Sequence, residues 1–418
     1  MANKNLKKYY LIKFFIFISL TLIILNPYSV YGKPGQLIAV GLAGYACFYG
    51  IKKALWHEML LPLTFLFFIS IVGLISSIAN GITQFNHIGS IISLIVVVLS
   101  VQGIWLIGSK IELSINSLIK IILAIIVLNS SIIILELIVD EFRAVVESFL
   151  DPLVDASINY ADGYKFRGIA SAGGANLSII IPAGVICALY LFSREKIGVI
   201  VLIFIFTILF FSITVMGRSG LIFSVIPLAL YPILNRRKLN RRSLFSLSII
   251  GIALVASLLF LKNYGVTFLS DKFGDDFLFY SFGFIFEGKE GFEEEGTLGI
   301  LGDFLTVLPN DFSSALFGYG FYGGSEFSPW TDSGYARMFL SVGYFFGALF
   351  YFVVIRLYLS KAKLDLFLVY SFVLVLSVAE VKESLLFSGY AARVFIIILT
   401  FFTLERSRFE SVAHYHRT

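Results

Sequence analysis

Long apolar runs recur along almost the whole chain, and this repetition constrains the fold more than any other feature. A helix that crosses a bilayer needs about 20 mostly apolar residues, and it satisfies its own backbone polar groups inside the hydrocarbon. Twelve runs approach that length, at residues 10–27, 35–51, 59–79, 88–108, 115–138, 175–192, 197–216, 219–234, 244–261, 337–359, 364–380 and 388–404. The chain is therefore predicted to be an all-α polytopic membrane protein of about 12 transmembrane helices, forming one integral membrane domain over residues 1–418.

Composition agrees with this prediction. Hydrophobic residues make up 58% of the 418 residues and charged residues only 14%, whereas soluble domains have roughly 45–50% apolar and about 25% charged residues. This excludes a soluble enzyme, a disordered protein and a nucleic-acid-binding protein. Cys47 and Cys187 both lie within apolar runs, which excludes a disulfide framework in the loops. Without a CxxC motif or a cluster of histidine and cysteine, no metal site is predicted.

The distribution of lysine and arginine predicts the orientation of the spans. If the N-terminus is cytoplasmic and the spans alternate, 18 basic residues fall inside, 11 outside and 3 within spans. The strongest basic run, 235–242, then lies inside, as the positive-inside rule requires. Twelve spans with both termini cytoplasmic are therefore predicted, and the net charge of +5 divides into +12 inside, −9 outside and +2 within spans.

The first span could be mistaken for a signal peptide, because lysines precede its apolar core. The residues that follow it, 26–29, have no convincing small-residue cleavage site, so an uncleaved anchor is favoured.

Two of the outside connections are long, at residues 140–174 and 262–336. Loops of this length carry function more often than short connections do. Within the second loop, residues 296–308 could form an amphipathic helix at the interface. Residues 316–324 are rich in glycine and aromatic residues and include Gly318 and Gly320, which are candidate substrate-binding positions. An aromatic belt at the membrane surface is the favoured interpretation for most of these aromatic residues.

Three arginines, Arg167, Arg218 and Arg337, are predicted to lie at the outer interface, each beside a span. Arginine binds phosphate in a planar, bidentate manner, and the neighbouring glycines and serines would let backbone N–H groups approach an anion. A lipid-linked pyrophosphate suits such a site, because its phosphates lie at the interface and its tail runs between helices. The alternative is that each arginine reaches to lipid headgroups or pairs with an acidic residue.

Neither long outside loop contains a histidine, so a general base there must be an acid or a tyrosine. The candidates are Asp332, Glu326 and Asp303, with Tyr335 nearby. Asp332 is favoured because it precedes Arg337 by five residues at the membrane surface. The acidic run 293–295 is interpreted as an exposed turn, since metal ligands must converge from several directions.

The chain resembles the O-antigen polymerase (Wzy-type) family, which belongs with the O-antigen ligases to one superfamily of membrane glycosyltransferases. The resemblance covers the layout of the whole chain and several short motifs. These motifs are Arg167 followed by Gly173-Gly174-Ala175-Asn176, the turn Gly217-Arg218-Ser219-Gly220, the stretch Gly318-Tyr319-Gly320-Phe321, and Asp332-Ser333-Gly334-Tyr335 with Arg337 and Gly343.

The resemblance implies a multi-pass protein of the bacterial inner membrane whose two long loops are periplasmic. It implies transfer of a growing glycan from one undecaprenyl pyrophosphate to the repeat unit on another, without a metal or soluble cofactor. In this interpretation Asp332, Arg337 and Arg218 are catalytic, and Arg167, Asn176, Tyr335, Gly318 and Gly320 bind substrate. The family also implies membrane lipid, a separate chain-length regulator protein and no nucleic acid as partners.

Two alternatives stay open at this stage. A ligase of the same superfamily would be expected to carry a histidine in the large loop, which this sequence lacks. A flippase for lipid-linked sugars is compatible with twelve spans, but transporters usually place polar groups near the midplane, and these spans contain few ionisable residues.

Overall fold

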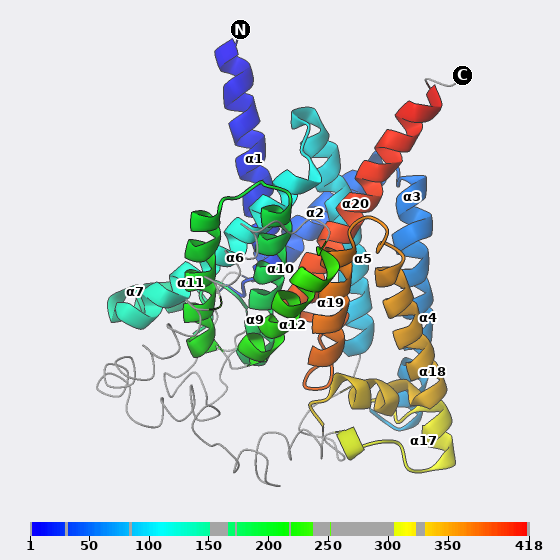
Figure 1. Ribbon diagram of the computed structural model, residues 1–418. Coiled ribbons are helices and arrows are strands. Elements are labelled where there is room, and N and C mark those ends of the chain that lie inside the picture. Colours follow the sequence, from blue (N-terminus) through cyan, green and yellow to red (C-terminus); the bar gives the residue numbers. More distant parts are fainter. Residues whose placement is uncertain are drawn as a thin grey trace. The chain divides into compact units, whose positions relative to one another are not determined.

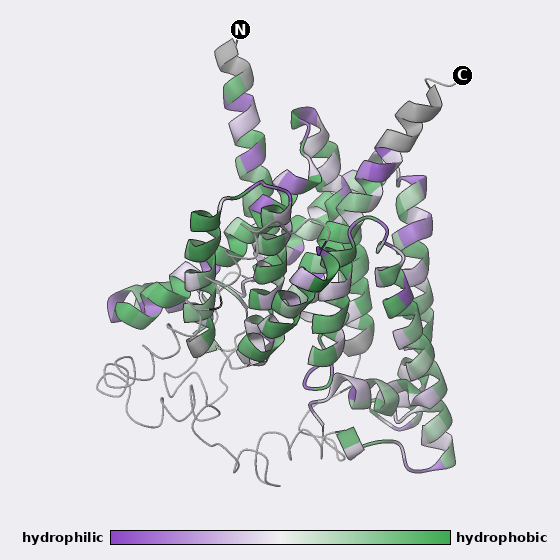
Figure 2. Ribbon diagram, viewed as in Figure 1, coloured by the Kyte–Doolittle hydropathy of each residue, from purple (hydrophilic) through white to green (hydrophobic). Residues whose placement is uncertain are grey.

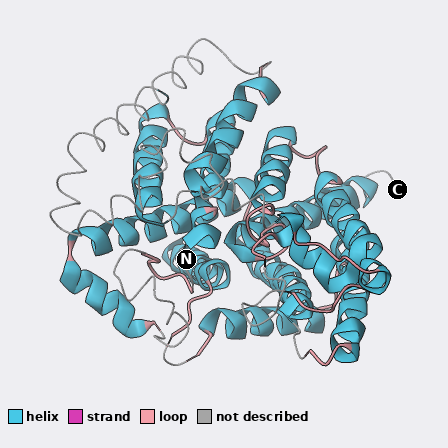
Figure 3. Cartoon of the chain, turned by 90° about the horizontal axis from the view of Figure 1, so that it is seen from below, coloured by secondary structure: helices cyan, strands magenta, loops and turns pink. Residues whose placement is uncertain are grey.

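A computed structural model of the chain describes residues 2–29, 32–82, 86–150, 166–171, 174–216, 219–236, 251, 305–322 and 331–415. Helices joined by loops and turns account for this part of the chain, and it contains no β-strand (Figure 3). The predicted all-α class is confirmed for these residues.

The helices of the first half are α1 (Ala2–Leu25), α2 (Pro34–Phe48), α3 (Lys53–Leu55), the π-helix η1 (Trp56–Leu60), α4 (Leu61–Ala79), α5 (Asn86–Gly108), the 3-10 helix η2 (Ser109–Ile111), α6 (Ile115–Ile138), α7 (Asp140–Phe149), α9 (Gly174–Ser178) and α10 (Ile180–Ser193). They are followed by α11 (Val199–Met216), α12 (Ser219–Leu234), α17 (Phe312–Phe317), α18 (Gly334–Leu359), α19 (Leu366–Ala379) and α20 (Gly389–Tyr415) (Figure 1).

Six helical segments within the described residues are long and apolar enough to cross a membrane, namely Leu6–Leu25, Lys53–Ala79, Ile88–Ile111, Ile115–Ile138, Asn176–Ser193 and Gly334–Leu359. Four shorter apolar helices are Pro34–Phe48, Val199–Ile213, Ser219–Leu234 and Leu366–Ala379. Figure 2 shows apolar colouring along most of the helix lengths and hydrophilic residues mainly near helix ends and turns. This is the pattern of an all-α membrane protein. The count of twelve and the orientation stay predictions, and the ninth predicted span, 244–261, lies outside the described residues except for residue 251.

Several predicted spans differ in detail from the helices. The span predicted at 337–359 begins earlier, at Gly334, and is broken at Gly343, where φ is 80° and ψ is 172°. The span predicted at 175–192 is divided into α9 and α10 at Ile179. By contrast, α12 continues through Pro227 and Pro232, because helices in apolar surroundings tolerate proline when neighbours satisfy the freed carbonyls.

The chain forms two compact units, and each is described by itself. The first comprises residues 1–24, 36–118 and 292–418, and the second comprises residues 25–35 and 119–291. In the first unit, α4 packs against α5 and α18, and α5 packs against α20. Aromatic rings fill part of this core: Phe372 and Phe395 stack with their centroids 4.6 Å apart, and Phe350 meets Phe387 at 4.8 Å.

In the second unit, α10 packs against both α11 and α12. Its side chains from Ile180 to Leu191 are all buried. The first long loop begins with the amphipathic helix α7, which belongs to this unit. The amphipathic helix predicted at 296–308 lies outside the described residues up to residue 304.

Candidate functional site

The first turn of α18 brings several predicted site residues together in the first unit. Ser333 caps the helix by accepting the N–H of Ala336. The guanidinium of Arg337 folds back over this cap: its Nε donates to the carbonyl of Thr331 at 2.8 Å, and its Nη2 donates to Oδ1 of Asp332 at 2.8 Å. The pairing with an acidic side chain, which was the alternative interpretation for Arg337, is therefore present.

The bonds to Thr331 and Asp332 engage only part of the Arg337 guanidinium. An arginine side chain has five N–H donors, and two of those of Arg337 are engaged by Thr331 and Asp332. The other three have no partner among the residues that the structure describes. The side chains of Arg337 and Asp332 are 21% and 39% exposed, so both can be reached by a ligand. This leaves an oriented cation with donors available, beside a carboxylate that is itself accessible.

Glu380 fastens the start of α18 to the connection that follows α19. Its side chain is fully buried, and Oε2 accepts the N–H groups of Leu385 and Leu386, both at 2.6 Å. Its Oε1 lies 2.8 Å from the hydroxyl of Tyr351, and its carbonyl accepts the N–H of Gly334 at 2.9 Å. A buried carboxylate with this many donors is a positioning group that fixes where the first turn of α18 begins.

Sequence reasoning gave Glu380 no role. The sequence did contain a signal for such a role. An acidic residue at the end of an apolar run is costly in a membrane, so it often marks a functional or positioning site. What the sequence could not show is which backbone groups the carboxylate satisfies, since they come from separate segments of the chain.

Tyr335 packs inward. Its hydroxyl donates to the carbonyl of Ser377 on α19 at 3.0 Å, and its ring lies 4.8 Å from that of Tyr351. Nearby, the hydroxyls of Tyr322 and Ser384 form a hydrogen bond. Burial raises the pKa of the Tyr322 phenol well above its usual range, Glu380 adds to the rise, and Arg337 partly opposes it. Tyr322 therefore stays neutral at physiological pH and acts as a hydrogen-bonding group.

Gly318 and Gly320 lie where two backbones approach each other closely. Both have positive φ, 73° and 82°. A Cβ at Gly318 would overlap the backbone of Ser341, and one at Gly320 would overlap the backbone of Ser77. The N–H of Gly320 donates to the carbonyl of Ser341 at 3.2 Å. Packing against α4 and α18 thus explains both glycines, while their predicted contact with substrate stays a prediction.

The segment 312–322 also explains why α18 is broken. A Cβ at Gly343 would overlap the backbone of Leu316, so the end of α17 packs into the break. Ser76 on α4 donates to the carbonyl of Phe317 at 2.7 Å, and Asn80 donates to that of Tyr319 at 3.0 Å. The described end of the large loop is therefore fixed to the helices of the unit that carries Arg337.

Arg167 belongs to the second unit, where α6 holds its segment in place. Asn129 accepts the N–H of Ile169 at 3.0 Å and donates to the carbonyl of Arg167 at 3.4 Å. Glu136 accepts the N–H of Gly168 at 3.2 Å. The Arg167 side chain is largely buried, with Nη1 placed 3.5 Å from the carbonyl of Ser171. Sequence reasoning gave neither Asn129 nor Glu136 a positioning role.

The structure says less about the remaining predicted site residues. Asn176 lies half-buried in α9, also in the second unit. Arg218, Asp303, Glu326 and the acidic run 293–295 lie outside the described residues. Among the residues that are described, no three histidine, cysteine or acidic side chains converge as metal ligands would.

Comparisons with protein-family models, curated protein sequences and solved structures found no match to this chain.

Proposed function

We propose that this chain is a membrane glycosyltransferase that polymerises oligosaccharide repeat units carried on undecaprenyl pyrophosphate, at the periplasmic face of a bacterial inner membrane. The observation that supports it is the guanidinium of Arg337, which Thr331 and Asp332 hold in place. Its other three N–H donors have no partner within the described part of the chain. The resemblance of the short motifs to O-antigen polymerases agrees with the same assignment.

The position of Arg337 within its helix favours an anionic ligand. It is the fourth residue of α18, where the helix dipole is positive and a cation is unfavourable by about 0.3–1 kcal/mol. Asp332 offsets part of that cost. A phosphate group would complete the neutralisation, because the guanidinium and the positive end of the helix dipole both attract it. A helix without an anionic ligand would be more stable with a neutral residue at this position.

The proposed reaction needs no metal and no soluble cofactor. The acceptor sugar's hydroxyl oxygen forms a bond to the anomeric carbon of the donor glycan, and the bond from that carbon to pyrophosphate breaks. The electron pair of the broken bond leaves with undecaprenyl pyrophosphate, whose growing charge Arg337 and Arg218 would stabilise. Asp332 would accept the hydroxyl proton. Arg167, Asn176, Tyr335, Gly318 and Gly320 are the proposed contacts to the bound substrates.

The test expresses variants of Arg337 in cells that lack the chromosomal copy of the gene. Arg337→Ala should leave the protein inserted at wild-type level while long polysaccharide chains disappear, because losing one donor to a developing anion slows such steps on the order of 10²-fold or more. Arg337→Lys should restore little, since lysine cannot bind in a bidentate manner. Lys110→Ala, which removes an exposed cation from η2 in the same unit, is the matched control and should leave the chains unchanged.

The pattern on a polysaccharide gel distinguishes the alternatives. Loss of a polymerase leaves lipid A core capped with one repeat unit. Loss of a ligase leaves bare core and long polymer stranded on its lipid carrier, and loss of a flippase leaves no repeat units outside. Either of these latter patterns, or full-length chains in the Arg337→Ala cells, would refute the proposal.

A further inference from the structure

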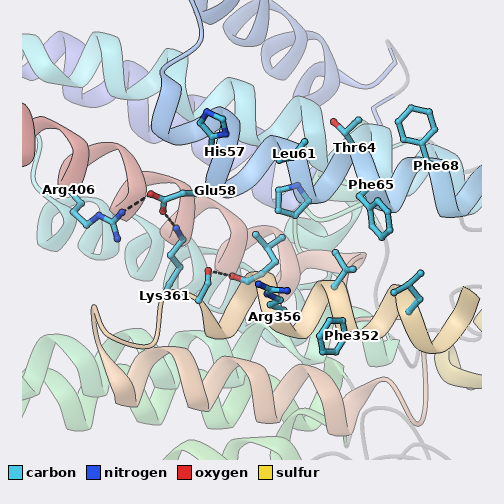
Figure 4. Close-up of a pocket in the computed structure, with 15 residues that line it drawn as sticks. His57, Glu58, Leu61, Thr64, Phe65, Phe68, Phe352, Arg356, Lys361 and Arg406 are labelled. Atoms are coloured by element: carbon cyan, nitrogen blue, oxygen red, sulfur yellow. Dashed lines mark hydrogen bonds and ion pairs between the residues drawn. The ribbon is translucent and has the colours of Figure 1, made fainter.

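A second candidate site lies at the opposite end of α18 from Arg337, within the same unit. It is a pocket of about 890 Å³ lined by residues of η1, α4, α18 and α20 together with the turn after α18 (Figure 4). This volume is within the roughly 300–1,000 Å³ typical of small-molecule sites. None of its lining residues belongs to the site proposed above.

One end of the pocket is polar and carries excess positive charge. Glu58 bridges two cations there: its Oε2 is paired with Lys361, and its Oε1 accepts from Nη2 of Arg406 at 2.6 Å. Arg356 is the third cation of the lining, and no acidic side chain in the described part of the chain pairs with it. The lining therefore contains three cations and one carboxylate, which leaves an excess charge of +2 when His57 is counted as neutral.

The groups that carry this charge differ in accessibility. Lys361 is buried, at 3% exposed, and is engaged by Glu58. Arg356 and Arg406 are exposed. The Lys361–Glu58 pair thus fastens the turn after α18 to η1, and the two arginines are the groups that a ligand would meet.

The rest of the pocket is apolar. It is lined by Phe65 and Phe68 of α4 and by Leu349 and Phe352 of α18. Figure 4 shows Phe65 on the side of α4 that faces α18. Phe65, Phe68 and Phe352 are exposed, at 45%, 60% and 59%. Both helices belong to segments long and apolar enough to cross a membrane, so in a bilayer these rings would face lipid chains.

We propose that this pocket binds a membrane phospholipid with an anionic headgroup. The phosphate would lie against Arg356 and Arg406, and one acyl chain would lie along Phe65, Phe68 and Phe352. Charge complementarity and the order of the lining, cationic at one end and aromatic along the rest, select an amphiphile over a free anion or an apolar molecule. The connections that supply the cations are those predicted to face the cytoplasm, where anionic lipids and basic pockets between helices commonly meet.

The test measures lipid binding to the full-length purified protein by native mass spectrometry after delipidation in a neutral detergent. Phosphatidylglycerol should bind at least about tenfold more tightly than phosphatidylcholine with the same acyl chains. Arg356→Ala should remove most of that difference, because it lowers the excess positive charge that favours a headgroup of net charge −1 over the zwitterionic headgroup of phosphatidylcholine. Arg236→Ala is the matched control, since it removes an exposed arginine from the basic connection after α12 and should change the preference little.

Two further measurements separate the sources of the effect. Leu349→Trp fills the apolar part without altering charge and should weaken both lipids, so it tests the acyl-chain contact. Inorganic phosphate at millimolar concentration should fail to displace phosphatidylglycerol. The proposal would be overturned by equal binding of the two lipids, by equal effects of the Arg356 and Arg236 substitutions, or by displacement with phosphate alone.

Discussion

Glu380 offers the sharpest test of how the start of α18 is held, because two substitutions that look similar should have opposite outcomes. Glu380→Ala removes every side-chain acceptor from a site that is fully buried. Glu380→Gln keeps the shape and one carbonyl oxygen. If hydrogen bonding positions this turn, alanine should be damaging and glutamine tolerated.

The magnitude follows from counting donors. In Glu380→Ala the N–H groups of Leu385 and Leu386, both held at 2.6 Å, lose their acceptor. Each buried donor left unsatisfied costs about 1–3 kcal/mol, so the two together cost about 2–6 kcal/mol. At roughly 2 °C per kcal/mol, the thermal midpoint should fall by roughly 4–12 °C.

Glutamine can satisfy the same groups. Its carbonyl can accept from Leu385 and Leu386, and its amide can donate to the hydroxyl oxygen of Tyr351. The Tyr351 proton then goes to the carbonyl of Gly334, which already lies 2.9 Å away. We therefore expect Glu380→Gln to melt within about 2 °C of the wild type.

The assay is thermal unfolding of the detergent-solubilised protein, followed by the loss of the monodisperse peak in size-exclusion chromatography. A wild-type midpoint for Glu380→Ala would refute the count of orphaned donors. An equal loss in both variants would instead show that the negative charge, and not the hydrogen bonds, is what the turn requires.

Three further predictions concern the segments around the candidate sites. Gly318→Ala should lower the free energy of unfolding by more than about 2 kcal/mol, because the strain at positive φ adds to the overlap of the new Cβ with backbone atoms. Gly50→Ala, at a φ of 84° in open space, should lower it only by the strain of about 1–3 kcal/mol. Equal thermal midpoints for the two variants would contradict the packing argument. Asn129→Leu should lower the free energy of unfolding by about 2 kcal/mol and shorten the polysaccharide chains, because the segment that carries Arg167 loses its hydrogen bonds to α6. Ser131→Ala on the same helix should change neither the stability nor the chain length. Wild-type chains and a wild-type thermal midpoint in the Asn129 variant would contradict this prediction. Hydrogen bonds from Ser314 lower the pKa of Asp311 at the start of α17, so its contribution to stability is present above about pH 4 and is lost as the pH falls through the lowered pKa. Asp311→Asn keeps the cap but does not titrate, so the difference in midpoint between wild type and variant should shrink below about pH 4, and a difference that stays constant from pH 7 to pH 3 would contradict the assignment.

The glycines show where sequence reasoning reached its limit. Gly318 and Gly320 stood out in the sequence because they belong to a stretch that resembles a motif of the O-antigen polymerases, and the resemblance led to a predicted contact with substrate. Their neighbours in space, Ser341 and Ser77, are 23 and 243 residues away along the chain. No pattern in the local sequence shows that two backbones will approach each other at that point.

The proximity of Asp332 and Arg337 could be read from the sequence, although the ion pair they form was the alternative interpretation and their catalytic roles stay predictions. Five residues apart at the start of a helix, they are close enough to pair, and the structure places their side chains 2.8 Å apart. The grouping itself was readable because it depends only on short-range geometry. The carboxylate that fixes this turn, Glu380, was not readable, because its partners come from α18 and from the connection after α19.

The sequence by itself indicated that the described part of the chain is helical and that its helices are apolar enough for a membrane, because the length and hydrophobicity of a run decide whether a helix can satisfy its backbone in lipid. It also determined which residues flank those helices. Only the tertiary structure decided that α18 is broken at Gly343, that Glu380 and Asn129 hold the candidate segments, and that Arg356 and Arg406 converge on one pocket. Each of these depends on contacts between residues far apart in the chain, where packing between helices, rather than periodicity within one helix, sets the outcome.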